Sequence, residues 1–419
     1  MRALSRVEGM RGRGRAPSFT PGFVLVELSL VTWLLFLPYL LSAHGHLDFA
    51  RHAVGRDFVN LWTAGQLVFT PHVTDIFNPT LFLGWEHRLF DPRLPFHFWS
   101  YPPPALFLAA PLAGLPYIPA LAVWSLVGLL ALVPAARLTF SRRAQRLLLL
   151  FAPAVAVNIA LGQNGALTGA LLLSGLALFE PRPLLAGALL GLLVFKPQLA
   201  VLLPVAVLAS RNWRAAAAAA ATASGVLLLS LVVFGPACWK GFFGPTLEMQ
   251  SAMLSHGQGP FQWMMPSVFM AARVEGAPAS LAMAAQVPFM LLGAAMVYGA
   301  FRRPGPVQDR TAILILATFI ATPQAFNYDL VAAAAVALAL IDRDRSFAGL
   351  LAGALLFALP TLLLAAQVVN VPFGPPILLY AGWRFYQSRP KGAEGKGEAA
   401  AEARRADSAS MAAETASNT

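Results

Sequence analysis

Residues 346–383 read SFAGLLAGALLFALPTLLLAAQVVNVPFGPPILLYAGW and contain no Asp, Glu, Lys or Arg. The hydrocarbon core of a bilayer, about 30 Å thick, is crossed by roughly 20 apolar residues in an α-helix. Backbone groups in lipid find no outside hydrogen-bond partner, so a crossing segment must be helical or part of a closed barrel. Barrel strands alternate in polarity. This stretch does not alternate, so it predicts transmembrane helices.

Six other stretches without charged residues occupy 28–47, 94–136, 147–179, 215–239, 276–301 and 311–328. Over the 419 residues, 58% are hydrophobic and 12% are charged, whereas a soluble globular chain is about one quarter charged. This composition excludes a cytosolic enzyme and a disordered protein. The single cysteine, Cys238, excludes an intramolecular disulfide and a cysteine-based metal cluster. We therefore predict an all-α protein, a polytopic transmembrane helical bundle.

The positions of the basic residues predict how the bundle is oriented. Five arginines precede the first apolar stretch, and further basic clusters occupy 137–146, 211–214, 302–310, 342–345 and 384–396. The positive-inside rule places these clusters in the cytoplasm, together with both termini. The first apolar stretch is long enough to span and shows no small-residue cleavage pattern, so it is not a cleaved signal. The formal charge of +11 thus reflects topology, and we expect no nucleic-acid partner.

We divide the chain into a basic cytoplasmic N-terminus at 1–21, a membrane domain at 22–387 and a cytoplasmic tail at 388–419. The tail is rich in Ala, Glu, Lys, Arg and Ser and is predicted to be disordered. About twelve helices are expected in the membrane domain, the shortest of them paired as hairpins or merged into kinked spans. Their predicted ranges are 22–43, 117–137, 147–161, 165–179, 183–195, 198–210, 215–234, 281–301, 311–323, 329–341, 347–366 and 374–387. Residues 102–114, which lie between prolines, predict a half-helix.

Two segments on the predicted outer face, about 44–100 and about 235–267, are longer than ordinary connections. The first holds six of the seven histidines, and the second holds His256. Titratable side chains therefore gather on the outer face, which is typical of an enzyme at the membrane surface. No two histidines have the i, i+4 spacing of ligands on one helix face, so we interpret them as interfacial. We expect no metal or other cofactor; a bound divalent ion is an alternative that the pattern does not support.

Asp57 stands out within Gly55-Arg56-Asp57-Phe58-Val59-Asn60-Leu61-Trp62. Apolar residues at 58, 61, 62 and 68 follow it at helical spacing, which predicts a helix lying along the membrane interface. One interpretation is that Asp57 caps this helix, where free N–H groups favour a carboxylate. The other is that Asp57 is a general base, held near the headgroup plane.

Three predicted hairpin tips on the outer side interrupt apolar runs, and each carries a glutamine: Gly162-Gln163-Asn164-Gly165, Lys196-Pro197-Gln198 and Thr322-Pro323-Gln324. A lysine inside an apolar stretch costs a few kcal/mol unless it is paired or faces water. We infer that Lys196 meets an anion, and a phosphate suits its compact ammonium group. The alternative is a side chain that extends to the lipid headgroups. Broken helices also direct free N–H groups into a cavity, which favours phosphate.

The third tip is followed by Asn327-Tyr328-Asp329. Asp329 begins a predicted helix, so it is either a helix cap or a second catalytic carboxylate. The second outer segment contains Trp239, Lys240, His256 and Trp263. Its tryptophans are either interfacial anchors or a platform for a sugar ring.

The order of these motifs resembles the bacterial GT-C glycosyltransferases of family 87, the polyprenol-phosphate-mannose-dependent α-mannosyltransferase group. The matching pieces are Gly55-Arg56-Asp57-Phe58, Trp62 with Ala64-Gly65, Tyr101-Pro102-Pro103, Pro111-Leu112, Leu115-Pro116, Gly162-Gln163-Asn164, Ala186-Gly187 with Gly191, Lys196-Pro197-Gln198 and the arginines at 211–214. The similarity covers most of 22–345. It rests on the ordered set, because no single piece is specific.

The resemblance implies a GT-C-like fold in a bacterial inner (plasma) membrane, with the active site on the outer, periplasmic face. It implies a sugar donor linked to polyprenyl phosphate and an inverting transfer without a nucleotide sugar. Asp57 matches the acidic residue of the first outer loop, which this family associates with acceptor activation. Related sequences often carry histidine in the segment after the late proline. This chain has Pro323-Gln324-Ala325-Phe326-Asn327 there, so any such role is absent or falls to Asp329.

These observations predict a membrane hexosyltransferase that moves a mannose-like sugar from a polyprenyl-phosphate donor to a lipid or glycan acceptor. Asp57 is the predicted general base, and Asp329 is the second predicted catalytic residue. The predicted substrate-binding residues are Arg56, Asn60, Tyr101, Gln163, Asn164, Lys196, Gln198, Lys240, His256 and Asn327. The alternative is a transporter or flippase for a polar or lipid-linked solute, which polar breaks in helices also suit. Large outer segments with many titratable residues favour the enzyme.

Overall fold

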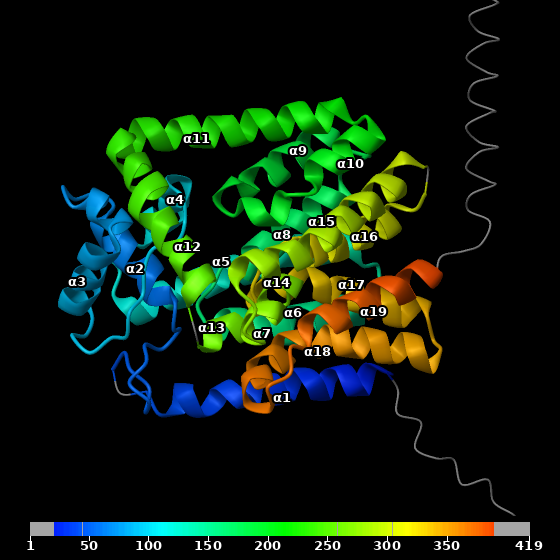
Figure 1. Cartoon of the computed structure of the whole chain (residues 1–419), viewed down its shortest axis with the longest axis horizontal. Helices are drawn as coiled ribbons and strands as arrows, with labels where there is room; N and C mark the ends of the chain where they lie inside the picture. The colour runs from blue at the N-terminus through cyan, green and yellow to red at the C-terminus, as the bar shows by residue number, and fades with distance from the viewer. Residues whose placement is uncertain (1–20, 44, 258, 304, 389–419) are drawn as a thin grey trace, which may run out of the picture.

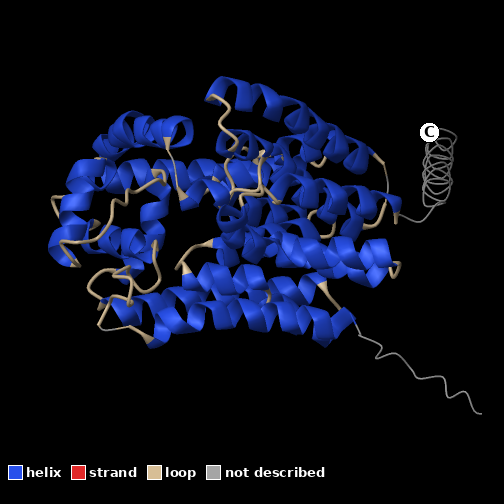
Figure 2. Ribbon diagram, turned by 60° about the horizontal axis from the view of Figure 1, so that its bottom comes forward, coloured by secondary structure: helices blue, strands red, loops and turns tan. Residues whose placement is uncertain are grey.

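The computed structural model of the protein describes residues 21–43, 45–257, 259–303 and 305–388. The predicted basic N-terminus up to residue 20, His44 and the predicted tail from residue 389 lie outside these ranges. Figure 2 shows helices and loops, and no strand occurs in the described part of the chain. A single isolated bridge joins Leu47 to Ala53. The predicted all-α fold is confirmed.

The α-helices are α1 (Pro21–Leu41), α2 (Phe58–Leu67), α3 (Pro79–Leu89), α4 (Leu106–Ala109), α5 (Tyr117–Thr139), α6 (Arg143–Leu150), α7 (Pro153–Ala160), α8 (Gly165–Ala177), α9 (Pro183–Gly191), α10 (Leu203–Ser210), α11 (Trp213–Gly241), α12 (Leu247–His256), α13 (Pro260–Trp263), α14 (Val268–Val274), α15 (Ala279–Arg302), α16 (Val307–Ala321), α17 (Val331–Arg343), α18 (Phe347–Val369) and α19 (Gly374–Gln387). Short 3₁₀ or π segments join or extend them: η1 (Val73–Phe77), η2 (Pro103–Ala105), η3 (Ala110–Leu112), η4 (Leu192–Phe195), η5 (Pro197–Ala200), η6 (Phe242–Thr246) and η7 (Asn327–Leu330).

The observed helices agree with the predicted ranges to within a few residues at most ends. The predicted helix 147–161 is divided into α6 and α7 just before Pro153, and the predicted half-helix 102–114 is α4 flanked by η2 and η3. Within the described ranges, six helices or merged runs are long and apolar enough to cross a membrane: Pro21–Leu41, Tyr117–Thr139, Arg143–Ala160, Trp213–His256, Ala279–Arg302 and Phe347–Val369. The protein is therefore a polytopic helical membrane protein.

The bundle has a buried centre and an outer surface rich in exposed apolar side chains. Helices α16 and α17 are buried along almost their whole length, whereas α1 and α11 lie at opposite edges in Figure 1 and expose most of their Leu and Val side chains. The sequence Gly187-Ala-Leu-Leu-Gly191 lets α9 approach α11 closely, because a Cβ at Gly187 would lie 2.2 Å from the Ala215 carbonyl oxygen. Small residues at this spacing are a common device of membrane helix pairs.

The two ends of the bundle differ in content. In Figure 1, α1 begins and α19 ends at the right, and the 44–100 segment with α2 and α3 gathers at the left. The helix expected after Asp57 is present as α2. It was expected to lie along the membrane surface, but its residues Phe58, Val59, Thr63, Ala64, Gly65 and Leu67 are buried among α3, α4 and α5. At Gly65 an added Cβ would lie 2.7 Å from the Ala109 carbonyl oxygen, so backbone contact encloses α2.

Candidate active site

Two cavities within the described part of the bundle bear on function. The larger, about 530 Å³, lies between α5, α8, α16 and α17, and its wall mixes apolar and polar side chains, among them the ion-paired Asp342 and Arg343. The smaller, about 330 Å³, lies where α2, α12 and the first hairpin tip meet. Its polar lining residues are Asp57, Asn60, His97, Ser100, Tyr101, Gln163, Asn164, Gln250, Gln324 and Tyr328. We assign the candidate active site to the smaller cavity, because its wall holds Asp57, which forms no ion pair with any described residue, whereas Asp342 and Arg343 of the larger cavity are held in ion pairs.

Asp57 is presented to the cavity by a tight turn. Gly55 and Arg56 both have left-handed backbone conformations, with φ of +82° and +44°, and such conformations at a non-glycine residue are uncommon. Asp57 occupies the N-cap position of α2, but its side chain accepts no capping hydrogen bond. Its Oδ2 instead accepts a hydrogen bond of 2.8 Å from Gln163 Nε2. The geometry thus argues against the capping interpretation of Asp57.

Gly162 and Gly165 allow the first hairpin tip to contact two segments, the turn before α2 and the turn that carries Asp329. Gly162 has φ +60°, and a Cβ there would lie 2.6 Å from the Gly55 carbonyl oxygen and 2.3 Å from Phe58 Cβ. On the other side of the tip, a Cβ at Gly165 would lie 1.8 Å from the Tyr328 carbonyl oxygen. Only glycine permits this spacing. The tip therefore holds Gln163 beside Asp57 and Asn164 beside the turn that carries Asp329.

The polar side chains of the tip continue into a network. The Tyr101 hydroxyl donates to Gln163 Oε1 at 3.0 Å, and Asn164 Nδ2 donates to the Tyr101 hydroxyl at 2.9 Å. Lys196 Nζ donates to Asn164 Oδ1 at 2.9 Å. Burial, with the nearby charge of Asp329, raises the pKa of Tyr101, so its hydroxyl keeps its proton and remains a donor. Hydrogen bonds thus link residues from four separate segments of the chain: Asp57, Tyr101, the adjacent Gln163 and Asn164, and Lys196.

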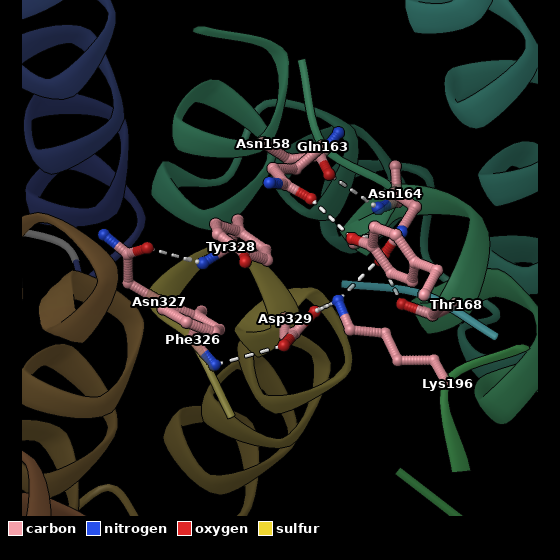
Figure 3. Close-up of polar contacts among 12 residues, drawn as sticks. Asn158, Gln163, Asn164, Thr168, Lys196, Phe326, Asn327, Tyr328 and Asp329 are labelled. Carbon is pink, nitrogen blue, oxygen red and sulfur yellow. Dashed lines mark hydrogen bonds and ion pairs between the residues drawn. The ribbon is translucent and has the colours of Figure 1, made fainter. Parts of the chain in front are cut away.

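Lys196 is paired with Asp329 behind the cavity wall. Its Nζ lies 2.5 Å from Asp329 Oδ1, and the two side chains are 3% and 0% exposed. Nζ also lies 4.9 Å from the centre of the Tyr328 ring, which borders the cavity. Asp329 Oδ2 accepts from the Phe326 backbone N–H at 3.1 Å, so Asp329 makes a capping bond and an ion pair together. Figure 3 shows Lys196 between Asp329 and Asn164. The anion that Lys196 meets in this structure is Asp329.

The other predicted site residues are only partly brought to this cavity. Asn60, one turn after Asp57 on α2, borders it and donates to the Phe98 carbonyl at 3.4 Å. Arg56 pairs with Asp48 at 3.0 Å. Asn327 is buried and bonds to backbone at Pro360 and Tyr328. Six predicted substrate contacts do not border the cavity, and neither does the predicted catalytic residue Asp329; the six are Arg56, Lys196, Gln198, Lys240, His256 and Asn327.

The second and third tips also meet. The hydroxyl of Thr322 donates to the backbone carbonyl of Gln198 at 3.1 Å. Gln324, which also comes from the third tip, borders the cavity. The three glutamine-bearing tips therefore converge from separate hairpins, although only Gln163 contacts Asp57.

Sequence reasoning missed Glu86. Its side chain is fully buried on α3, and neither carboxylate oxygen has a hydrogen-bond partner within the described chain. Burial, with the nearby charge of Asp57, raises the pKa of Glu86 to about 8. A sequence signal existed, because Pro79, Phe82 and Glu86 fall on one face of the helix. A carboxylate within an apolar stripe marks a protonated or functional group.

Two more cavity residues, Trp99 and His97, carry polar atoms that lack a partner. Trp99 Nε1 and His97 Nδ1 are buried and make no hydrogen bond in the described structure, and the same holds for Asn60 Oδ1. A buried unpaired polar group costs about 1–3 kcal/mol. All three residues border the cavity. Among the described residues, no three His, Cys, Asp or Glu side chains gather closely enough to hold a metal ion.

Comparison with curated proteins and with solved structures returns no match. A model of glycosyltransferase family 87 matches residues 99–323, which is more than half of the chain. The matched range includes Tyr101, Gln163, Asn164 and Lys196 and lies between Asp57 and Asp329. The role of the two carboxylates thus rests on their geometry. The chain belongs to glycosyltransferase family 87, and it is a membrane glycosyltransferase.

Proposed function

We propose that the protein transfers a hexose, mannose or a similar sugar, from a polyprenyl-phosphate donor to a hydroxyl of a lipid or glycan acceptor. The reaction takes place on the outer face of a bacterial plasma membrane, with both chain termini in the cytoplasm. Membership of the family and the grouping of α2 and α3 at one end of the bundle support this arrangement. The single observation that carries the proposal is Asp57 on the wall of a cavity that also presents amide and hydroxyl groups, with its carboxylate making no helix-capping bond.

Asp57 serves as the general base. Gln163 holds Oδ2 of the carboxylate, so Oδ1 is left to take the proton from an acceptor hydroxyl. As that O–H bond breaks, the acceptor oxygen attacks the anomeric carbon. The bond between that carbon and the phosphate oxygen breaks on the opposite face, and its electron pair stays on the phosphate. This is the arrangement of inverting sugar transfer, with the base and the leaving group on opposite faces of the ring.

Cavity residues complete the site. Asn60, His97 and Trp99 offer an acceptor oxygen, a ring nitrogen and an indole N–H that have no partner within the described residues. Sugar hydroxyls, which both donate and accept, satisfy such groups. The cavity of about 330 Å³ is large enough for a hexose ring with part of its acceptor.

The donor phosphate requires a cation that is not already neutralised. Lys196 is covered by Asp329 and Arg56 by Asp48, whereas Lys240 is exposed and forms no ion pair with any described residue. Lys240 lies at the end of α11, beside Trp239, whose ring stacks on Phe243 at 5.7 Å. Aromatic residues of this kind favour the membrane interface, where a polyprenyl phosphate carries its headgroup. Lys240 is our candidate for the first contact with that phosphate.

Transfer in proteoliposomes tests the proposal. Purified protein receives radiolabelled polyprenyl-phosphate hexose in one reaction and the matching nucleotide sugar in another, each with a lipid-linked glycan acceptor. We expect a new glycosidic bond from the polyprenyl-phosphate donor only. Product from the nucleotide sugar alone would refute the donor assignment. Passage of labelled solute across the bilayer without a new bond would instead favour the transporter.

A further inference from the structure

A continuous chain of side-chain hydrogen bonds joins Asp57 to the buried Lys196–Asp329 pair. In order, its members are Asp57, Gln163, Tyr101, Asn164, Lys196 and Asp329, and the links from Asp57 to Lys196 are 2.8, 3.0, 2.9 and 2.9 Å long. Figure 3 shows the part around Asn164, Lys196 and Asp329. The mechanism above uses only the Asp57 end of this chain.

The chemistry of the two ends fixes the direction of every link. Lysine can only donate hydrogen bonds, and an ionised carboxylate can only accept them. Asn164 must therefore present Oδ1 to Lys196 and Nδ2 to the Tyr101 hydroxyl. That hydroxyl is used as an acceptor on one side, so its proton points to Gln163 Oε1, which turns Gln163 Nε2 towards Asp57. All four donors point from Lys196 towards Asp57. The orientations of the Asn164 and Gln163 amides are therefore fixed by the lysine at one end and the carboxylate at the other.

Because all four donors point the same way, the hydrogen bonds polarise one another in a single direction, from Lys196 towards Asp57. Each donor is strengthened by the bond that its own residue accepts, and the effect is larger where water is excluded. Lys196 is 2% exposed and Asn164 is 6% exposed, so little solvent weakens the links. Lys196 thereby fixes the orientation of every donor up to Gln163, whose amide N–H points at the ionised Asp57 carboxylate, and this also fixes which carboxylate oxygen faces the acceptor.

The alternative roles of Lys196 fit the structure less well. Neither Lys196 nor Asp329 borders the cavity, so a phosphate there would have to displace Asp329 from a closed pair. A buried ion pair is also weak as a stabilising device, because the cost of removing two charges from water offsets their attraction. An apolar pair of similar volume would hold the helices together equally well. A function through Asn164 explains why a charge is kept at this position.

We propose that Lys196 is a positioning residue for Asp57, acting through Asn164, Tyr101 and Gln163, and that it does not bind the donor phosphate. This inference rests on the proposed function, in which Asp57 is the base. No proton travels along the chain, because the amide groups of Asn164 and Gln163 donate hydrogen bonds without releasing their protons. The proton taken from the acceptor stays on Asp57 until it is exchanged with solvent.

Other groups that titrate near Asp57 do not hide the effect. Glu86 on α3 couples to Asp57, and its pKa of about 8 keeps it neutral at lower pH. Tyr101, Tyr117 and Tyr328 also couple to it, and phenols are neutral near pH 7. Arg56 is always charged and pairs with Asp48. His97 borders the cavity, so every variant is also compared in the same His97→Gln background.

The test compares pH–rate profiles of purified variants in proteoliposomes with polyprenyl-phosphate hexose. Lys196→Met alone can fail to fold, since it leaves Asp329 buried and unpaired. The main variant is therefore Lys196→Met with Asp329→Asn, which keeps an acceptor for the Phe326 N–H. Tyr101→Phe breaks the chain while leaving the ion pair in place. The control is Arg142→Gln with Asp342→Asn, which removes the ion pairs of Asp342 with Arg142 and Arg345 at the other end of the bundle.

The double variant Lys196→Met with Asp329→Asn and the variant Tyr101→Phe are each expected to lower kcat about 10-fold and to change the KM of donor and acceptor less than about 3-fold. Both should also move the acidic limb of the pH–rate profile to higher pH. Combining them should lower kcat little further, because both act through one chain. The control should keep the wild-type profile. A raised donor KM with unchanged kcat would overturn the inference in favour of a phosphate ligand. An unchanged profile would overturn it in favour of a purely structural pair. Full activity in Asp57→Asn would instead refute the proposed function itself.

Discussion

The two ends of the helical bundle use their charges in different ways. At the end where α19 finishes, arginines pair directly with carboxylates between helix ends: Arg142 with Asp342, Arg310 with Glu180, Arg343 with Asp309, Arg345 with Asp342 and Arg384 with Asp344. In each pair at least one side chain is partly exposed. The other end also has ion pairs, Arg56 with Asp48 and Arg93 with Asp91, but there Asp57 has no ion pair and Glu86 has no hydrogen-bond partner among the described residues, and Lys196 is enclosed with Asp329.

This difference indicates that the charges have different roles at the two ends. Ion pairs at a water-exposed end are inexpensive, and each contributes at most about 1 kcal/mol. Buried carboxylates and unpaired polar atoms destabilise the fold by comparison. A sequence that keeps them in one cavity, while it pairs its charges elsewhere, keeps them for chemistry. Substitutions at the two ends test this difference.

The largest effect is expected at Gly165. A Cβ in Gly165→Ala would overlap the Tyr328 carbonyl oxygen, 1.8 Å away, and backbone cannot yield as a flexible side chain does. We expect transfer activity to be lost and the free energy of unfolding to fall by about 3 kcal/mol or more. The measurement is activity together with thermal unfolding in detergent. The matched control is Gly225→Ala on α11, where nothing lies within 4 Å of the added Cβ, and wild-type activity is expected. Full activity in Gly165→Ala would show that the tip does not depend on this contact.

Glu86 predicts a pH dependence of stability. Its pKa is raised from 4.5 to about 8 in the folded protein, so between these values the unfolded chain is ionised while the folded chain must hold a proton. Stability should therefore decrease as the pH rises from about 4.5 to about 8, by several kcal/mol at most, and then stay level. Glu86→Gln imitates the protonated form and should remove this decrease.

Thermal unfolding at pH 5 and pH 8 measures the Glu86 effect. We expect Glu86→Gln to unfold at a higher temperature than wild type at pH 8 and at a similar temperature at pH 5. Glu248→Gln, which removes an exposed carboxylate from the second outer segment, is the control and should follow wild type at both pH values. Equal curves for wild type and Glu86→Gln would mean that the Glu86 carboxyl is solvated.

A moderate effect is expected at Lys240. Removing an exposed, unpaired cation beside the interface in Lys240→Ala should raise the KM for the polyprenyl-phosphate donor about 3- to 10-fold, with kcat nearly unchanged, because a screened phosphate contact contributes about 1 kcal/mol. Steady-state kinetics at low and high ionic strength check this, and Lys240→Arg should retain wild-type values. An unchanged donor KM would move the phosphate contact to another residue.

The smallest effect is expected at the paired end. Arg142→Gln removes an arginine whose side chain is 65% exposed, so the free energy of unfolding should change by less than about 1 kcal/mol. Transfer activity should be that of wild type. A large loss of activity would show that the two ends are coupled, and it would contradict the separate roles assigned to them.

Much of the fold could be predicted, because helices in lipid leave a local signal. Long apolar runs bounded by proline, glycine or arginine gave helices such as α5, α15 and α18 nearly at their observed ends. The failures concern contacts between distant segments. The pattern around Asp57 predicted a helix at the membrane surface, and α2 is enclosed because Gly65 meets the backbone at Ala109.

The residues of the site could be predicted from the sequence better than the contacts between them. Asp57, Gln163, Asn164, Lys196 and Asp329 each interrupt an apolar context, and this is visible locally. That Lys196 meets Asp329, and that Gln163 meets Asp57, depends on how the hairpin tips pack in three dimensions. The packing is decided at Gly162 and Gly165, where the sequence shows two glycines but not which backbone each one will touch.

The most direct test of the account is the conservative variant Asp57→Asn, assayed for stability, donor binding and transfer in one preparation. The side chain keeps its size and can still accept from Gln163, so we expect unchanged unfolding and an unchanged donor Kd. Transfer should fall about 100-fold or more, because the proton acceptor is gone. Wild-type transfer by this folded variant would contradict the claim that the unpaired charge at the outer end is kept for catalysis.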